Sequence, residues 1–313
     1  MTSPAQISKT PPELAAAFRI FLNRAPAQRN SFGYSDHYEL NRSLAESPEF
    51  LESARAYKNV LGWPLSQVFI SLPARVMYCP IGKNACTFLK TEVARSAQYE
   101  LIDYMARDIH FLTDYVCTGL QLSDYTPERV SQLCDDSSFY KFAILRDPAD
   151  RLLSAYIEKL VIGRTTPENI HHTKSVVVPI QKARGIEQPD FNLGITFRQF
   201  INHLAVADPK HLDPHWKPQV LYLQGINYDR FFRIDQLDEL MDILEKRAGI
   251  QLNRKARNVT GSGSGIDVDG AMDLSPLEIA AQPKISRASF FDASLQQTVE
   301  TFFADDYRLL QQT

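Results

Sequence analysis

Two short stretches of this chain combine cations with hydroxyl and amide donors, the groups that proteins use to hold phosphate. The first contains Lys83 and Thr87, with the backbone N–H groups of Asn84, Ala85 and Cys86 between them. An apolar run precedes Lys83 and a helical pattern follows it. These donors are therefore expected at a helix N-terminus, where anions bind. The stretch predicts a site for a 5′-phosphate-type anion that needs no metal.

The second stretch places a guanidinium at the end of a strand. The continuous apolar run 142–145 predicts a strand covered on both faces, and the Asp-Pro pair after it predicts a helix start. Arg146 then lies at the carboxyl edge of the strand, the usual ligand-binding edge of an open α/β sheet. Arg151 and Ser154 follow and are predicted to complete a phosphate clamp. The alternative is a local ion pair of Arg146 with Asp147, beside an ordinary helix serine.

The first stretch does not match the phosphate loop of nucleoside triphosphatases. That loop requires a glycine where this chain has Met77, and Ser or Thr directly after the lysine to hold Mg²⁺, where this chain has Asn84. A kinase or NTPase is therefore disfavoured. Two phosphate-type sites in one domain favour a ligand with two separated anionic ends.

These stretches resemble the two donor-binding segments of sulfotransferases. Residues 81–87 (IGKNACT) resemble the 5′-phosphosulfate-binding loop, and residues 146–154 (RDPADRLLS) resemble the 3′-phosphate-binding segment. The closer resemblance is to the carbohydrate sulfotransferases of the chondroitin 4-O and HNK-1 type (sulfotransferase family 2), and it runs in order through residues 75–310. It implies an α/β, P-loop-like sulfotransferase fold with a central, mostly parallel sheet flanked by helices. Gly82 departs from the proline common before the lysine.

The resemblance implies an enzyme that transfers a sulfuryl group from 3′-phosphoadenosine 5′-phosphosulfate (PAPS) to a hydroxyl of a carbohydrate or glycoconjugate. Lys83 is then expected to stabilise charge on the departing phosphate, which leaves as adenosine 3′,5′-bisphosphate (PAP). Lys255 and Arg257, in a basic stretch before a glycine-rich run, are candidates for the 3′-phosphate end by position only. Two alternatives stay open: a non-catalytic adenosine bisphosphate-binding module, and a sulfotransferase acting on a lipid or peptide hydroxyl.

The acceptor hydroxyl needs a general base, and histidine suits that role near neutral pH. His110 precedes the predicted strand at 142–145. The resemblance makes His110 a candidate, because related glycan sulfotransferases have their base in this region. His215 lies in the segment 213–219 (DPHWKPQ), which resembles the His-Trp block of the family. Either histidine can serve as the base, with Glu92 and Asp103 as carboxylate alternatives.

No metal is expected. The pair His171-His172 resembles half a metal site, but no other Cys/His cluster in the sequence completes it. The four cysteines show no paired spacing, so reduced thiols are expected, with Cys86 as a space-filler. The net charge of −3 gives no reason to expect nucleic acid as a partner. No transmembrane run or signal peptide is visible in the sequence, which favours a cytoplasmic location. The animal members of the family differ in this respect, because they resemble Golgi proteins with an N-terminal anchor.

The chain is predicted to divide into an N-terminal helical extension, residues 1–70, and a sulfotransferase catalytic domain, residues 71–313. Helical spacing predicts helices over residues 11–24 and 36–60, the second broken near Pro48. Further helices are expected at 84–96, 148–162, 196–205 and 236–248, with a strand at 231–234. Residues 163–190 are predicted to form a long loop.

Overall fold

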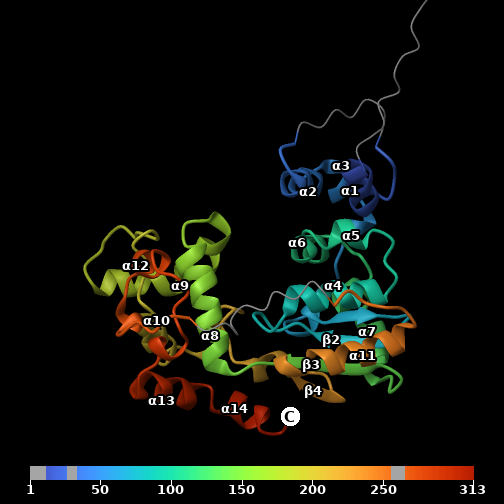
Figure 1. The fold of residues 1–313 in the computed structure, drawn as a ribbon. Helices are drawn as coiled ribbons and strands as arrows, with labels where there is room; N and C mark the ends of the chain where they lie inside the picture. The colour runs from blue at the N-terminus through green and yellow to red at the C-terminus, as the bar shows by residue number, and fades with distance from the viewer. Residues whose placement is uncertain (1–11, 27–33, 255–264) are drawn as a thin grey trace, which may run out of the picture.

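The computed structural model of this chain describes residues 12–26, 34–254 and 265–313. The architecture is α/β, with helices on both faces of a small central sheet (Figure 1). The helices are α1 (Pro12–Leu22), α2 (His37–Ala45), α3 (Pro48–Leu51), α4 (Cys86–Ser96), α5 (Ile102–Met105), α6 (Ile109–Tyr115), α7 (Pro127–Asp135), α8 (Pro148–Tyr156), α9 (Pro167–Ala183), α10 (Phe197–Leu204), α11 (Leu237–Ala248), α12 (Pro276–Ala280), α13 (Ala293–Phe302) and α14 (Ala304–Leu310). The strands are β1 (Phe69–Ser71), β2 (Val76–Cys79), β3 (Tyr140–Leu145) and β4 (Arg230–Arg233).

The sheet is mixed, which corrects the expectation of a mostly parallel sheet. Its order is β1-β2-β3-β4, and β1 runs antiparallel to β2, while the β2–β3 and β3–β4 pairs are parallel. The reason is local, because only residues 72–75 join β1 to β2. A parallel pair needs a crossover of about a dozen residues or more, so this turn can only make a hairpin.

The register of the parallel strands brings the two predicted phosphate segments together. Cys79, the last residue of β2, pairs with Ala143 of β3. The loop after β2 and Arg146 after β3 therefore leave the sheet at the same carboxyl edge. This edge is the usual ligand-binding edge of such a sheet.

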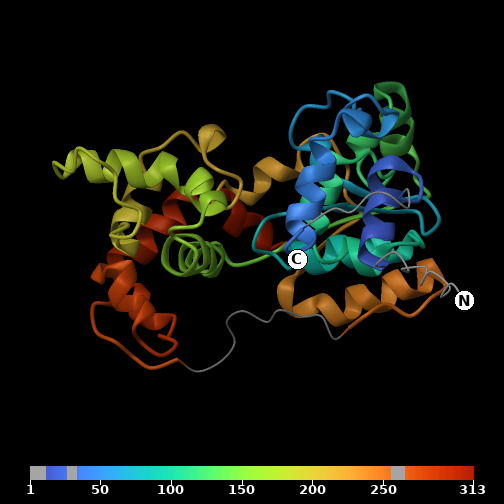
Figure 2. The same cartoon turned by 90° about the horizontal axis from the view of Figure 1, so that it is seen from above.

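Two large hydrophobic cores lie on either side of this edge. One contains the buried side chains of α1, α2, α4, α5, α6 and α11 packed on the sheet. The other joins α8, α9, α10, α12 and α13 around the buried rings of Phe197, Phe200 and Trp216. Figures 1 and 2 show the corresponding two groups of elements, with β3 leading from the sheet into α8.

Most predicted elements are confirmed, including α1, α4, α10, α11 and β4 close to their expected bounds. The stretch predicted as helical over 36–60 is confirmed at its start and at the break near Pro48, but its α-helices, α2 and α3, end at Leu51. The loop predicted for residues 163–190 is wrong, because α9 occupies most of it. The side chain of Thr166 caps α9 by accepting from the N–H of Asn169, and Pro167 stands at a first helical position. These are ordinary start signals. Val176 and Val177 then bury the helix against the second core, with Pro179 tolerated inside it.

The N-terminal helices share a core with the sheet elements, since Phe18 and Phe21 of α1 belong to the same buried cluster as Leu89 of α4. The predicted division of the chain at residue 70 stays a prediction, and β1 spans that position. Among the described residues, no helix is both long enough and apolar enough to cross a membrane. The cytoplasmic location also stays a prediction.

Candidate active site

The loop between β2 and α4 has the backbone form of an anion site. Lys83 and Ala85 both adopt positive φ, 70° and 57°, a conformation that non-glycine residues seldom adopt and that recurs at ligand clamps. Ala85 is the N-cap of α4 and provides no side-chain cap. The first turn of this eleven-residue helix therefore keeps N–H groups that a bound anion can satisfy.

Lys83 is held by an acidic partner that sequence reasoning missed. Its ammonium pairs with Glu158, and the ammonium of Lys159 contacts the other carboxylate oxygen at 3.1 Å. Burial alone would raise the pKa of Glu158, but the two lysines outweigh that effect and lower it to about 2. Glu158 and Lys159 lie in a π-helical segment, Ile157–Ile162, that continues α8, and π-helical turns are frequent at functional sites.

Asn84 has a structural place inside the loop. It is fully buried, and its amide donates to the Ile144 carbonyl at 2.8 Å and to Gln219 Oε1 at 2.6 Å. Its own backbone N–H donates to the Ile81 carbonyl. Gln219 also donates to the Arg146 carbonyl at 2.9 Å. This network ties the loop after β2 to the end of β3.

The same network reaches the C-terminal helix. Asp306 of α14 is 1% exposed and accepts from the backbone N–H groups of Gln219 and Val220 at 2.8 and 2.9 Å. Burial raises the pKa of Asp306, although these donors favour its charged form. Asp306 therefore holds the segment that carries Gln219 against α14.

Arg146 lies where the sequence placed it, at the carboxyl end of β3. Its guanidinium is half-buried and donates to the Lys83 carbonyl at 3.1 Å. It also lines a cavity of about 410 Å³ at the ends of β3 and β4, together with Arg233 and Tyr307. Three carboxylates line the same cavity, so its charge is mixed: Asp147, Asp150 and Asp235. Arg146 thus stands between this cavity and the Lys83 loop.

Arg151 differs from its predicted role as a phosphate ligand. It is 1% exposed, and its guanidinium donates to the carbonyls of Gly82, Lys217 and Pro214 at 2.9, 2.8 and 3.0 Å. The side chain therefore clamps the Lys83 loop to the segment 213–219. Its hydrogen-bonding directions are taken by the protein, which indicates a positioning role.

His110 meets the loop, but its lone pair is turned toward a cation. Its Nε2 lies 2.9 Å from Thr87 Oγ1 and its Nδ1 lies 3.1 Å from the ammonium of Lys90. Because an ammonium only donates, Nδ1 must be the acceptor and Nε2 carries the proton. His110 is solvent-exposed, with its Nδ1 edge partly buried against Lys90. Partial desolvation of the ring beside the loop, and then the positive charge of Lys90, lower the pKa of His110 below its usual value.

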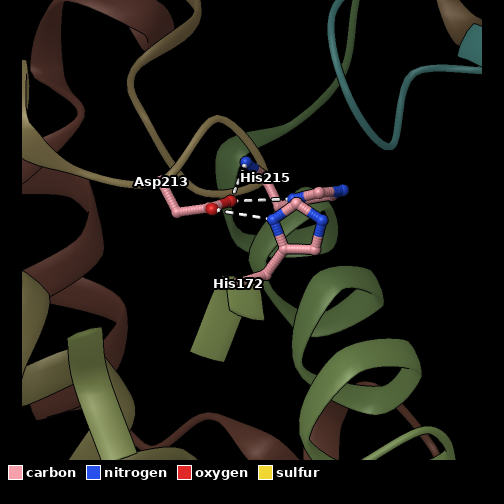
Figure 3. Close-up of side chains that lie close together, drawn as sticks. All are labelled: His172, Asp213 and His215. Carbon is pink, nitrogen blue, oxygen red and sulfur yellow. Dashed lines mark hydrogen bonds and ion pairs between the residues drawn. The ribbon is translucent and has the colours of Figure 1, made fainter. Parts of the chain in front are cut away.

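His215 has the opposite arrangement, shown in Figure 3. Its Nδ1 lies 2.7 Å from Asp213 Oδ1, and Asp213 Oδ2 lies 3.0 Å from Nδ1 of His172 on α9. With Nδ1–H donating to the carboxylate, Nε2 of His215 keeps its lone pair and has no protein partner among the residues described. Burial lowers the pKa of His215, which Asp213 only partly offsets, so the ring is neutral near pH 7. A methyl group added at Gly82 would lie 3.8 Å from both the Cα and the ring atom Cδ2 of His215, so His215 lies beside Gly82 of the Lys83 loop.

The His172, Asp213 and His215 side chains also form a set that could hold a metal ion, with one ligand atom from each lying within 4.8 Å of the others. The sequence showed no other Cys/His cluster to complete the His171-His172 pair, and the expectation that no metal binds stays a prediction. Asp213 and His215 complete the set through tertiary contact. The Asp-x-His spacing was the available signal, but nothing in the sequence linked it to α9.

The carboxylate alternatives lie elsewhere. Glu92 is fully buried and accepts from the Asn253 N–H at 2.8 Å, and Asp103 is exposed beside Arg95. Burial raises the pKa of the Cys86 thiol, in line with a space-filling role, and all four cysteines are free. Ser154 is half-buried on α8. Lys255 and Arg257 lie outside the described residues.

The comparisons with known proteins bear on the family of this chain. The sulfotransferase family profile matches residues 66–311. Carbohydrate sulfotransferase 14 of Danio rerio is 25% identical over 59% of this chain and 49% of its own length. The Homo sapiens protein of that name is 26% identical over 53% and 42%, and carbohydrate sulfotransferase 10 of Xenopus laevis is 27% identical over 60% and 54%.

The chain spans about half the length of the curated relatives it matches. No solved structure matches it significantly. The family match covers both predicted phosphate segments, the His215 segment and the C-terminal helix α14. This chain belongs to the sulfotransferase family.

Proposed function

We propose that this protein transfers a sulfuryl group from PAPS to a hydroxyl of a carbohydrate or glycoconjugate. The observation that carries the proposal is the contact between the Lys83 loop and an Asp213-oriented His215 with a free Nε2. In this proposal, the reaction centre lies between Lys83, as the leaving-group cation, and His215, as the base. The names of the relatives, carbohydrate sulfotransferases 14 and 10, support the acceptor class.

The donor would lie along the shared edge of β2 and β3, in the manner of a P-loop-like sulfotransferase fold. The N-terminus of α4 and Lys83 would hold the phosphosulfate end, with Thr87 at its margin. Arg146 and Ser154 would hold the 3′-phosphate, and from the resemblance Lys255 and Arg257 would assist. Lys83 must exchange Glu158 for the donor, so the ion pair is the resting state of the leaving-group cation.

His215 is the base that we favour over His110. Transfer requires the acceptor oxygen to attack sulfur while the bond from sulfur to the 5′-phosphate oxygen breaks. The hydroxyl proton passes to Nε2 of His215, and PAP leaves with the electron pair of the broken bond. Asp213 stabilises the imidazolium that forms, as carboxylates do for catalytic histidines. His110 supplies no comparable lone pair, because its Nδ1 faces Lys90.

The test uses labelled PAPS with a panel of glycans, a lipid alcohol and a hydroxyl-bearing peptide. Sulfated glycan is expected, together with PAP binding in EDTA that ATP–Mg²⁺ does not match. Label only in the lipid or peptide would overturn the acceptor class. PAP binding without transfer to any of these acceptors would favour a non-catalytic bisphosphate-binding module.

A matched pair of variants tests the base. His215→Asn is expected to lower turnover by about a hundredfold to ten-thousandfold with PAP affinity retained. His211→Asn, which changes a strongly exposed histidine four positions away, is the control. Turnover of His215→Asn at the control level would remove His215 from the mechanism.

A further inference from the structure

The side chains of His172, Asp213 and His215 together offer a ligand set, although the proposed transfer reaction uses only Asp213 and His215 and needs no metal. Both imidazoles direct Nδ1 at one carboxylate, at 3.0 and 2.7 Å (Figure 3). The two histidine rings lie 4.5 Å apart between centroids. Two imidazoles and one carboxylate are the three protein ligands typical of open Zn²⁺ sites, which leave the fourth position to water or substrate. We propose that these three residues bind one Zn²⁺ ion.

The protein holds this set in place before any ion arrives. The Asp213–His215 turn is fixed because the Pro214 carbonyl accepts from both Arg151 and Tyr222, and because Trp216 is fully buried. The third ligand comes from α9, a capped helix of seventeen residues. Metal binding therefore needs only small side-chain movements.

Local charge and access also permit a cation. The ligand side chains are 26%, 14% and 22% exposed for His172, Asp213 and His215, so an ion can reach them. The nearby ammonium groups of Lys83 and Lys159 are both paired with Glu158. Their charge is thus partly balanced, and the Asp213 carboxylate remains available as an anionic ligand.

Zinc at this site would switch off the base, an inference that rests on the proposed function. A metal binds the lone pair of a neutral imidazole, so coordination through Nδ1 moves the ring proton of His215 to Nε2. The nitrogen that would accept the hydroxyl proton then has no lone pair. Zinc binding and sulfuryl transfer become mutually exclusive through one change of tautomer.

The binding experiment uses the full chain, with calorimetry for Zn²⁺ and visible absorption for Co²⁺. One equivalent of Zn²⁺ and a Co²⁺ spectrum of tetrahedral type are expected. His172→Ala should lower the affinity for Zn²⁺ by roughly tenfold or more, because the loss of a residue that only supports a ligand already lowers metal affinity by that factor. His171→Ala, the exposed neighbour on the same helix, is the matched control. Equal Zn²⁺ affinity in both variants, or no stoichiometric binding, would overturn the site.

The activity experiment compares turnover with saturating Zn²⁺ and after EDTA. Wild type and His171→Ala should lose about a hundredfold or more, the size of a general-base contribution, and should recover in EDTA. For His172→Ala, turnover is compared with the metal-free rate of the same variant, and a correspondingly higher Zn²⁺ concentration should be needed to inhibit it. Stoichiometric binding without inhibition would overturn the tautomer switch and count against His215 as base. Failure to bind zinc would leave the proposed transferase activity untouched.

Discussion

Replacing Arg151 by methionine tests whether this side chain holds the site together or binds the donor. The sequence predicted a phosphate ligand, whereas the guanidinium donates to the carbonyls of Gly82, Pro214 and Lys217. Methionine keeps much of the volume but removes the donors. The change therefore separates structural support from anion binding.

The expected loss of stability follows from the three carbonyls. The Pro214 carbonyl keeps the Tyr222 hydroxyl as a donor, whereas the Gly82 and Lys217 carbonyls lose theirs. Each acceptor left without a donor costs about 1–3 kcal/mol, which gives about 2–6 kcal/mol in all. Removal of a buried charge offsets part of this, because the desolvation of the guanidinium is no longer required. The free energy of unfolding of Arg151→Met should therefore fall by about 2–4 kcal/mol, the lower part of that sum.

Urea unfolding measures this difference, and PAP calorimetry below the unfolding transition measures donor affinity. Arg308→Met is the control, because that guanidinium is 72% exposed and pairs only with Asp305 nearby on α14. It should cost less than about 1 kcal/mol. If Arg151→Met is no less stable than the control but binds PAP far more weakly, Arg151 contacts the donor and the clamp argument is wrong.

Three further predictions concern the loop and its partners. Lys83→Ala should lower turnover more than PAP affinity, because the charge that Lys83 stabilises develops in the transition state. Arg146→Ala should mainly weaken PAP binding, by about 2–3 kcal/mol. Kinetics and PAP calorimetry of both variants distinguish these roles, and equal losses of PAP affinity without a loss of turnover would contradict them. His110→Ala should keep turnover within about tenfold of wild type, since its lone pair faces Lys90, and a loss of the size expected for a general base would reassign that role. Glu158→Gln tests the ion pairs of Glu158 with Lys83 and Lys159 through the pH dependence of stability. The pKa of Glu158 is lowered from 4.5 to about 2. The contribution of these ion pairs to the free energy of unfolding is therefore complete above pH 4.5 and is lost as the pH falls toward 2. The difference in unfolding free energy between wild type and Glu158→Gln should therefore narrow over that interval, and a difference that stays constant would refute the assignment.

Local signals were sufficient for most individual elements. The apolar run before Arg146 and the Asp-Pro pair after it predicted β3 and α8, because burial on both faces and proline at a first helical position are local properties. The misassigned loop at 163–190 shows the limit of this reasoning. Its Thr-Pro helix start was readable, but an internal proline and mixed polarity obscured the helix that the second core stabilises.

The candidate site also contains features that the sequence predicted and features that it did not. The positions of Lys83 and Arg146 at strand ends followed from sequence order, because parallel strands bring their carboxyl ends to one edge. The partner of Lys83 could not be predicted, since Glu158 is 75 positions away and no spacing rule pairs them. The roles of the two histidines were equally open, because each depends on which group faces Nδ1.

By itself the sequence determined the family and most of the helices and strands that carry the two predicted phosphate segments, because these depend on residue type and short-range spacing. Only the tertiary structure decided that Arg151 is a clamp, that Lys90 occupies the lone pair of His110, and that α9 brings His172 to Asp213, 41 positions away. These outcomes depend on how packed elements orient side chains against one another. A hydrogen bond or a ligand set is specified by ångström-scale geometry, which local spacing does not determine.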